Sequence, residues 1–147
     1  MKKIFLLLTC VLIFVLTLGI FYLNNKNPNV TINQKTFYVD IAKSDSEHEK
    51  GLSIYNKIPV NRGMIFLFNK PDYYSFWMKN MKFSIDIIYI RDDKIVDIFQ
   101  NVSLPKSSYE NLPIIKPEEK ADMVLEINSG LSNKYNFKKG DSVKIKI

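Results

Sequence analysis

The sequence predicts an α+β, mainly β domain, barrel-like or sandwich-like with one or two short helices, preceded by an N-terminal transmembrane helix. Three observations support this prediction. Short apolar or alternating segments recur with turn residues between them, which is typical of β-strands. The length of 147 residues suffices for one domain and not for two. Residues 4–23 contain no charged side chain.

The N-terminus predicts a membrane anchor. Lys2 and Lys3 precede the uncharged run, which as a helix would span the roughly 30 Å core of a bilayer. Positive residues favour the cytoplasmic side. We therefore expect a single-pass protein of the cytoplasmic membrane, divided into four parts: a cytoplasmic stub (1–3), a transmembrane signal anchor (4–23), a linker (24–29) and a single extracytoplasmic domain (30–147).

Two other interpretations of the N-terminus are open to test. Thr17-Leu18-Gly19 forms a passable signal-peptidase site, and cleavage there would secrete the chain with an apolar tail. A lipoprotein site at Cys10 fits less well, because threonine precedes it and the apolar run before it is short. The intact anchor is the preferred interpretation.

The first elements of the domain are a strand and a capped helix. Residues 36–41 alternate between apolar and polar side chains, which predicts a half-buried strand. Ser44, with Glu47 three residues later, forms a capping box that opens a short helix towards Leu52.

Further strands follow the helix. A turn at 91–93 predicts a β-hairpin, and residues 138–141 predict a turn before the last strand. Residues 101–122 hold three of the six prolines and no periodic pattern, so they predict a long surface loop. The predicted strands are 63–68, an aromatic strand at 73–78, 84–90, 94–100, 123–127 and 142–147.

Composition excludes several kinds of chemistry. The 21 basic and 15 acidic residues are scattered and form no stripe of the kind that binds nucleic acid. The only cysteine, Cys10, lies in the apolar run, and the only histidine, His48, lies between two glutamates on the predicted helix. The folded part therefore cannot build a disulfide, a cysteine-ligated zinc site or a two-histidine site. We expect no metal, no cofactor and no nucleic-acid partner, and a surface position for His48.

Asp86 departs from the core pattern. It shares a strand face with Ile88 and Ile90, and the other face is also apolar, so its carboxylate must find donors or keep its proton. It is either an acid, base or ligand-binding group or a group that ties a loop to the sheet. We expect it to accept hydrogen bonds from residues 77–81. Other candidate partners are Arg62 and the backbone amides of a nearby turn.

Glu126 poses the same problem beside Val124. Two carboxylates on strands form a glycosidase pair when they stand roughly 5 to 9 Å apart across a cleft. Asp86 and Glu126 are therefore the candidate catalytic residues.

Trp77 is the only tryptophan, and it lies beside Lys79 and Asn80. This grouping is typical of a ligand platform on which a sugar stacks while polar groups orient it. The alternative is that Trp77 anchors the core. The candidate ligand-binding residues are Arg62, Trp77, Lys79, Asn80 and Asp86.

Several blocks resemble the prokaryotic "domain of unknown function 192" family over residues 36–147. They are Gly51-Leu52, Arg62-Gly63-Met64-Ile65-Phe66, Phe76-Trp77-Met78-Lys79-Asn80-Met81, Asp86-Ile87-Ile88, Leu125-Glu126-Ile127 with Gly130, and Gly140-Asp141. The chain departs from the family pattern at Ser53-Ile54-Tyr55 and at Met81.

The resemblance implies a compact, mostly β domain that is often secreted or membrane-tethered and has no established activity. It places Trp77, Lys79, Asn80, Asp86 and Glu126 in the shared pattern. It also implies structural turns at Gly63, Gly130, Gly140 and Asp141.

Three functions remain open on this basis. The first is a non-catalytic binding module for an envelope glycan or a protein partner. The second is a hydrolase of envelope polysaccharide that uses Asp86 and Glu126. The third is a structural accessory of a membrane complex, docked through the 101–122 loop.

Overall fold

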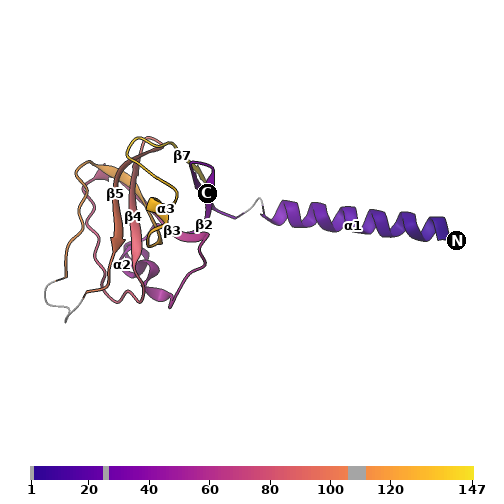
Figure 1. Ribbon diagram of the computed structural model, residues 1–147, viewed down its shortest axis with the longest axis horizontal. Coiled ribbons are helices and arrows are strands. Elements are labelled where there is room, and N and C mark those ends of the chain that lie inside the picture. The colour runs from indigo at the N-terminus through magenta and orange to yellow at the C-terminus, as the bar shows by residue number, and fades with distance from the viewer. Residues whose placement is uncertain (1, 25–26, 106–111) are drawn as a thin grey trace.

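A curled β-sheet forms the body of the computed structural model, which describes residues 2–24, 27–105 and 112–147. Helix α1 (Lys2–Asn24) extends away from the sheet domain (Figure 1). Among the described residues the sheet has seven strands: β1 (Asn29–Ile32), β2 (Lys35–Ala42), β3 (Arg62–Asp72), β4 (Ile85–Arg91), β5 (Lys94–Val102), β6 (Ala121–Asn128) and β7 (Val143–Lys146).

The strands are ordered β5-β4-β6-β3-β2-β1-β7. Neighbours are antiparallel except for β2 and β3, which are parallel. The two edge strands approach each other through a bridge between Lys94 and Ser142. Next to the bridge, the Val143 amide donates to the Asp93 carbonyl oxygen (2.8 Å) and the Gly140 amide to the Ile95 carbonyl oxygen (2.8 Å). The sheet therefore curls into a partly closed barrel.

Each face of the sheet has its own apolar core. The inner face is the one that includes Ile95 and Val143 from the two closing edges, and it also carries Val30, Phe37, Ile65, Ile88, Leu125 and Ile127. The outer face carries Met64, Phe66, Ile87, Tyr89 and Val124. Helix α2 (Asp45–Lys50), the 3₁₀ helix η1 (Gly51–Ile54) and residues from the 74–83 segment pack on or near the outer face.

Local sequence signals account for several elements. The Ser44 side chain accepts a hydrogen bond from the Glu47 amide, and Glu47 accepts one from the Ser44 amide (2.8 Å), which confirms the capping box. The backbone hydrogen bonds from Ser44 and Lys43 lower the pKa of Glu47 to about 2. The hairpin of β4 and β5 is also confirmed, with Asp92 and Asp93 at positive φ in its turn.

The predicted aromatic strand at 73–78 is wrong. Only Phe76 pairs there, in an isolated bridge with Ile115. Tyr74 and Phe76 pack on the outer face instead, with Tyr74 stacked on Phe68 and Phe76 edge-on against Phe66. Strand β1, which begins at Asn29 within the predicted linker, and the short helix α3 (Leu131–Lys134) were not predicted. Of the predicted 101–122 loop, residues 106–111 lie outside the described residues.

The membrane anchor stays a prediction. In the described part of the chain, no helix combines the length and hydropathy needed to cross a membrane.

Candidate ligand-binding pocket

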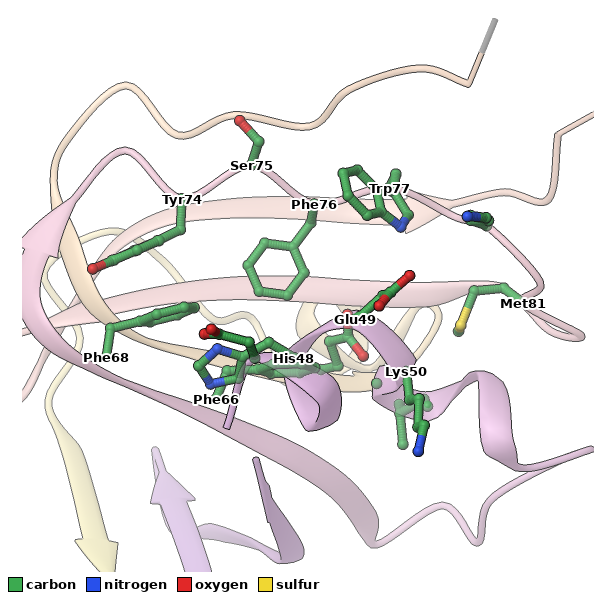
Figure 2. A pocket seen from close by; sticks show the side chains of 15 residues that line it. His48, Glu49, Lys50, Phe66, Phe68, Tyr74, Ser75, Phe76, Trp77 and Met81 are labelled. Carbon is green, nitrogen blue, oxygen red and sulfur yellow. The ribbon is translucent and has the colours of Figure 1, made fainter. Parts of the chain in front are cut away.

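A pocket of about 450 Å³ lies on the outer face of the sheet, between α2 and the 74–81 segment. Figure 2 shows Phe76 and Trp77 on one side of it and His48 and Phe66 on the other. The residues that line it are Asp45, His48, Glu49, Lys50, Gly51, Leu52, Phe66, Phe68, Tyr74, Ser75, Phe76, Trp77, Lys79, Met81 and Glu126.

Helix α2 supplies one wall because of its spacing. Asp45, His48 and Glu49 are three and four residues apart and share a helix face, and all three line the pocket. The expected surface position of His48 is wrong, because the ring is half-buried. Its Nε2 lies 3.1 Å from the Ala42 carbonyl oxygen, and its ring centre lies 4.6 Å from that of Phe68. The helix therefore presents histidine as part of the aromatic lining.

The opposite wall is held by ring packing in place of strand pairing. Tyr74 stacks on Phe68 with ring centres 3.6 Å apart, and Phe76 packs edge-on against Phe66 at 5.0 Å. Beneath them the Tyr89 hydroxyl donates to the Tyr74 carbonyl oxygen (3.1 Å). Burial raises the pKa of the Tyr89 hydroxyl, so that it stays a donor at neutral pH. These contacts fix the segment that carries Trp77.

Glu126 is the buried acidic residue of the pocket. It lies on β6 opposite Met64 and Ile87, and only 5% of its surface is exposed. Its Oε2 atom has no hydrogen-bond partner among the described residues. Burial raises the pKa of its carboxyl to about 8, although a hydrogen bond from the Leu52 backbone acts in the opposite direction. At neutral pH this buried carboxyl is therefore mostly protonated.

Two glycines shape the surroundings of Glu126. Gly51 has φ of +48°, and a Cβ there would lie 3.2 Å from Phe66 Cζ and 3.6 Å from Glu126 Oε2. Gly63 lies within β3, where a Cβ would come to 2.4 Å from the Glu126 carbonyl oxygen. The predicted turn at Gly63 is therefore wrong, because the residue is glycine to let two strands approach.

The structure brings together only part of the predicted ligand-binding set. Trp77, which is 45% exposed, and Lys79 both line the pocket. Asn80 adopts a positive φ of 60° and does not line it. Arg62 lies elsewhere and pairs with Asp40 at 3.3 Å.

Asp86 is a structural group on the inner face. It is fully buried, and it accepts hydrogen bonds from the amides of Asn101 (2.8 Å), Gly130 (2.9 Å) and Ser132 (2.8 Å). Among the described residues these amides are its donors, so the expected donors at 77–81 are wrong. Since both of its oxygens accept hydrogen bonds and no part of it is exposed, Asp86 presents no surface to a ligand.

The two candidate catalytic carboxylates do not form a pair. Asp86 is paired across the sheet with Ile127, whereas Glu126 is paired with Ile87. Directly opposed residues share a face, so the Asp86 and Glu126 side chains point to opposite faces of the sheet. A glycosidase pair that acts on one bond cannot be built from them.

The remaining turn residues serve the backbone. Gly130, at φ of 81°, caps the start of α3, and Gly140, at φ of 89°, lies in the turn before β7. Asp141 Oδ2 accepts hydrogen bonds from Asn33 Nδ2 (2.7 Å) and from the Lys138 amide (2.9 Å). These positions agree with the turns that the family resemblance implies.

Sequence reasoning missed most of the lining. The spacing of Asp45, His48 and Glu49 on a capped helix was a usable signal, as was the aromatic run that includes Tyr74 and Phe76. No signal in the sequence joined these segments to β3 or β6. No group of three or more metal-ligating side chains that could hold an ion occurs within the described ranges.

Comparisons with known proteins point to one family. The model of DUF192, described as uncharacterized ACR, matches residues 28–145. The chain is 30% identical to a crystal structure of a protein of unknown function from Novosphingobium aromaticivorans, with a TM-score of 0.71 over 79% of this chain and 83% of that one. It is 27% identical to a structure from Sinorhizobium meliloti described as a proposed transcription regulator, with a TM-score of 0.71 over 81% and 93%. A comparison with curated proteins finds no match.

Proposed function

Since this chain belongs to the DUF192 family, which is uncharacterized, we propose a function that rests on its pocket. The protein is a non-catalytic binding module, and the pocket at Trp77 takes a glycan of the cell envelope. One observation carries this proposal: the half-exposed indole of Trp77 lies at an aromatic-lined pocket of about 450 Å³. That volume is within the range of ligand pockets.

The lining suits a sugar ring. Sugars present apolar C–H faces that stack on aromatic rings, and they present hydroxyl groups to polar side chains at the rim. Trp77, Phe76 and Phe66 supply the rings, while Glu49 and Lys79 supply polar groups. The placement of Asp86 and Glu126 on opposite faces of the sheet supports binding without hydrolysis.

A titration with envelope polysaccharide fragments tests the proposal. Trp77 is the only tryptophan of the chain, so its fluorescence reports directly on occupancy of the pocket. We expect saturable quenching or enhancement. By calorimetry, Trp77→Ala should weaken binding at least tenfold, because the variant loses the ring on which the sugar stacks.

Tyr73→Ala is the matched control. Tyr73 is an exposed aromatic residue (43%) four positions away that does not line the pocket, so its removal should leave affinity within about twofold. Capture of a protein by crosslinking, with no response to any glycan, would favour the alternative of a protein partner. Docking of the 101–122 loop on a membrane complex remains a separate prediction.

We propose further that residues 4–23 tether the module outside the cytoplasmic membrane. The support is the uncharged run that follows Lys2 and Lys3. The helical backbone of α1 covers this run. Cleavage and secretion is the alternative, and both place the pocket where envelope glycans occur.

A further inference from the structure

We infer that the glycan unit held in this pocket carries a free ammonium group, and that the Glu126 carboxylate recognises that group. This inference rests on the proposed function and specifies the class of sugar: an amino sugar whose amine is not acylated. The observations that carry it are the unpartnered carboxyl oxygen of Glu126, the charges of the lining and the aromatic rings around it.

A hydrogen bond from the Leu52 backbone is the structural contact of the Glu126 carboxyl, and it leaves the Oε2 atom unpartnered among the described residues. The neighbours of Glu126 across the sheet, Met64 and Ile87, are apolar. Buried polar groups in native proteins are almost always paired. Asp86 shows the contrast, because three backbone amides satisfy it. A carboxyl left unsatisfied where it lines a pocket indicates that a ligand supplies the partner.

The lining of the pocket becomes net acidic once Glu126 ionises, which favours a cation beside this carboxylate. Helix α2 contributes Asp45, His48, Glu49 and Lys50 to the lining, and the 74–81 segment contributes Lys79. Tyr89 of β4 lies outside the lining, and Glu126 helps to raise the pKa of its hydroxyl. Around Glu126 the carboxylates of Asp45 and Glu49 balance Lys50 and Lys79, so ionisation of Glu126 makes the lining acidic, although basic residues outnumber acidic ones, 21 to 15, in the whole chain. Both lysines are exposed, whereas Glu126 is buried.

The aromatic rings of the lining also favour an ammonium group over a neutral substituent. The faces of aromatic rings carry partial negative charge and attract ammonium groups. Phe66, Phe76 and Trp77 therefore add to the attraction of a carboxylate for a cation, whereas they offer a neutral sugar stacking alone. A sugar that carries a carboxylate would bring no cation to Glu126 and would meet Glu49 as a like charge.

Binding then releases a proton. Without a cation beside it, the buried Glu126 is mostly protonated at pH 7 and below, and a nearby ammonium group favours its ionised form. The ligand enters as R–NH₃⁺ and the carboxyl loses its proton to the buffer. The bound state is the ion pair R–NH₃⁺ with Glu126 carboxylate, so charge and protons balance.

Three tetrasaccharides with the same β-1,4-linked backbone test the inference: those of glucosamine, N-acetylglucosamine and glucose. They differ at C2, which carries an ammonium, an acetamide or a hydroxyl group. Calorimetry on the full chain in detergent micelles at pH 6, where most amines of the glucosamine tetramer already carry a proton, in two buffers with different ionisation enthalpies, measures both affinity and proton release. We expect the glucosamine tetramer to bind at least tenfold more tightly than the others and to release nearly one proton.

Glu126→Gln removes the charge and keeps the shape. In this variant the preference for the glucosamine tetramer should fall to about twofold or less, and proton release should disappear. Glu119→Gln, an exposed glutamate paired with Lys139 outside the pocket, should keep both properties. If Glu126→Gln does not fold, the inference is still tested by the unmodified chain, because proton release can be compared among the three tetramers.

Two kinds of outcome overturn the inference, and they differ in whether the proposed glycan binding is overturned as well. Equal or tighter binding of the acetylated or glucose tetramer, or binding of the glucosamine tetramer without proton release, overturns the ammonium assignment and leaves glycan binding supported. Failure of all three tetramers to bind overturns both the assignment and the proposed function.

Discussion

Asp86 and Glu126 are both carboxylates on apolar strands, yet the fold gives them different chemistry. The register of β4 against β5 shifts between Ile85 and Ile87, and the Asn101 amide beside this irregularity donates to Asp86. The first turn of α3 adds two more amides. Glu126, on the other face, is left with an unpartnered oxygen. Asp86 thus holds the inner structure together, while Glu126 remains available to the pocket.

Asp86→Asn should destabilise the domain. The substitution keeps the shape, removes the charge and turns one acceptor into a donor that faces other donors. Losing this charge-assisted set should cost roughly 1.5–3 kcal/mol, which means a fall in melting temperature of several degrees. Asp92→Asn, in the exposed hairpin turn, should cost about 0.5 kcal/mol or less. Equal melting of the two variants would refute the structural role of Asp86.

Glu126 should make stability depend on pH. The pKa of its carboxyl is raised from an ordinary value of 4.5 to about 8 in the folded state. Between these pH values the unfolded chain loses this proton and the folded chain keeps it, so the free energy of unfolding falls as pH rises, by up to about 1.4 kcal/mol per unit. The contribution of the Glu126 proton to the free energy of unfolding is fully present below pH 4.5 and is lost by about pH 8.

Urea titrations at several pH values between 5 and 8 measure this slope. Other groups also titrate, so the informative quantity is the difference between the unmodified chain and Glu126→Gln. That difference should change steadily in favour of the variant as pH rises. Parallel pH curves for the two proteins would show that the pKa of Glu126 is ordinary.

At the residue scale the sequence shows that Asp86 and Glu126 are acidic residues in apolar strands, but it does not show their hydrogen-bond partners. An acidic residue between isoleucines is visible as an anomaly at Asp86. Its donors come from Asn101, Gly130 and Ser132, which only the pairing of distant strands brings near. No local pattern encodes that pairing, and the nearer residues 77–81 were therefore the wrong choice.

At the scale of elements, local rules succeed where the signal is local. The capping box of α2 and the β4–β5 hairpin follow from a few adjacent residues. The aromatic segment at 73–78 has the composition of a strand, but its rings find partners in Phe66 and Phe68, and its backbone pairs only at Phe76. Tertiary packing here overrides β-propensity. Strand β1 is short and half polar, which hides it in a sequence.

Gly63→Ala should loosen the contact between β3 and β6. The new Cβ would meet the Glu126 carbonyl oxygen at 2.4 Å, and a backbone atom cannot move aside as a flexible side chain does. We expect a loss of about 3 kcal/mol in urea unfolding. Gly140→Ala is the control, since its Cβ would meet nothing within 4 Å and only its φ of +89° is unfavourable. That variant should lose about 1 kcal/mol, and equal losses would contradict the close approach of the strands.

At the scale of the whole molecule, the recurring short apolar and alternating segments were enough to predict the mainly β class, while the pocket could not be predicted from the sequence. Its lining comes from α2, η1, β3, β6 and the 74–81 segment, which are far apart in the chain. The family resemblance identified Trp77, Lys79 and Glu126 as members of one pattern. Only the three-dimensional structure shows that these three line one pocket whereas Asp86 faces away from it.

The location of the protein also belongs to this scale. If residues 4–23 remain as an anchor, mass spectrometry of the native membrane fraction should find the intact N-terminal peptide. Extraction at alkaline pH should leave the chain with the lipid. A mature chain that begins near Ile20 would show cleavage and secretion instead.

The place of β1 in the sheet determines where the chain can be shortened. β1 lies between β2 and the C-terminal strand β7, and apart from the bridge at Ser142 it is the sheet neighbour that β7 has. Its side chains Val30 and Ile32 are fully buried. A chain that starts at Asn27 keeps this strand, whereas one that starts at Thr36 frees the C-terminus as well. The two ends of the domain are therefore joined through β1. Only residues before Asn29 can be removed without taking away the strand with which β7 pairs.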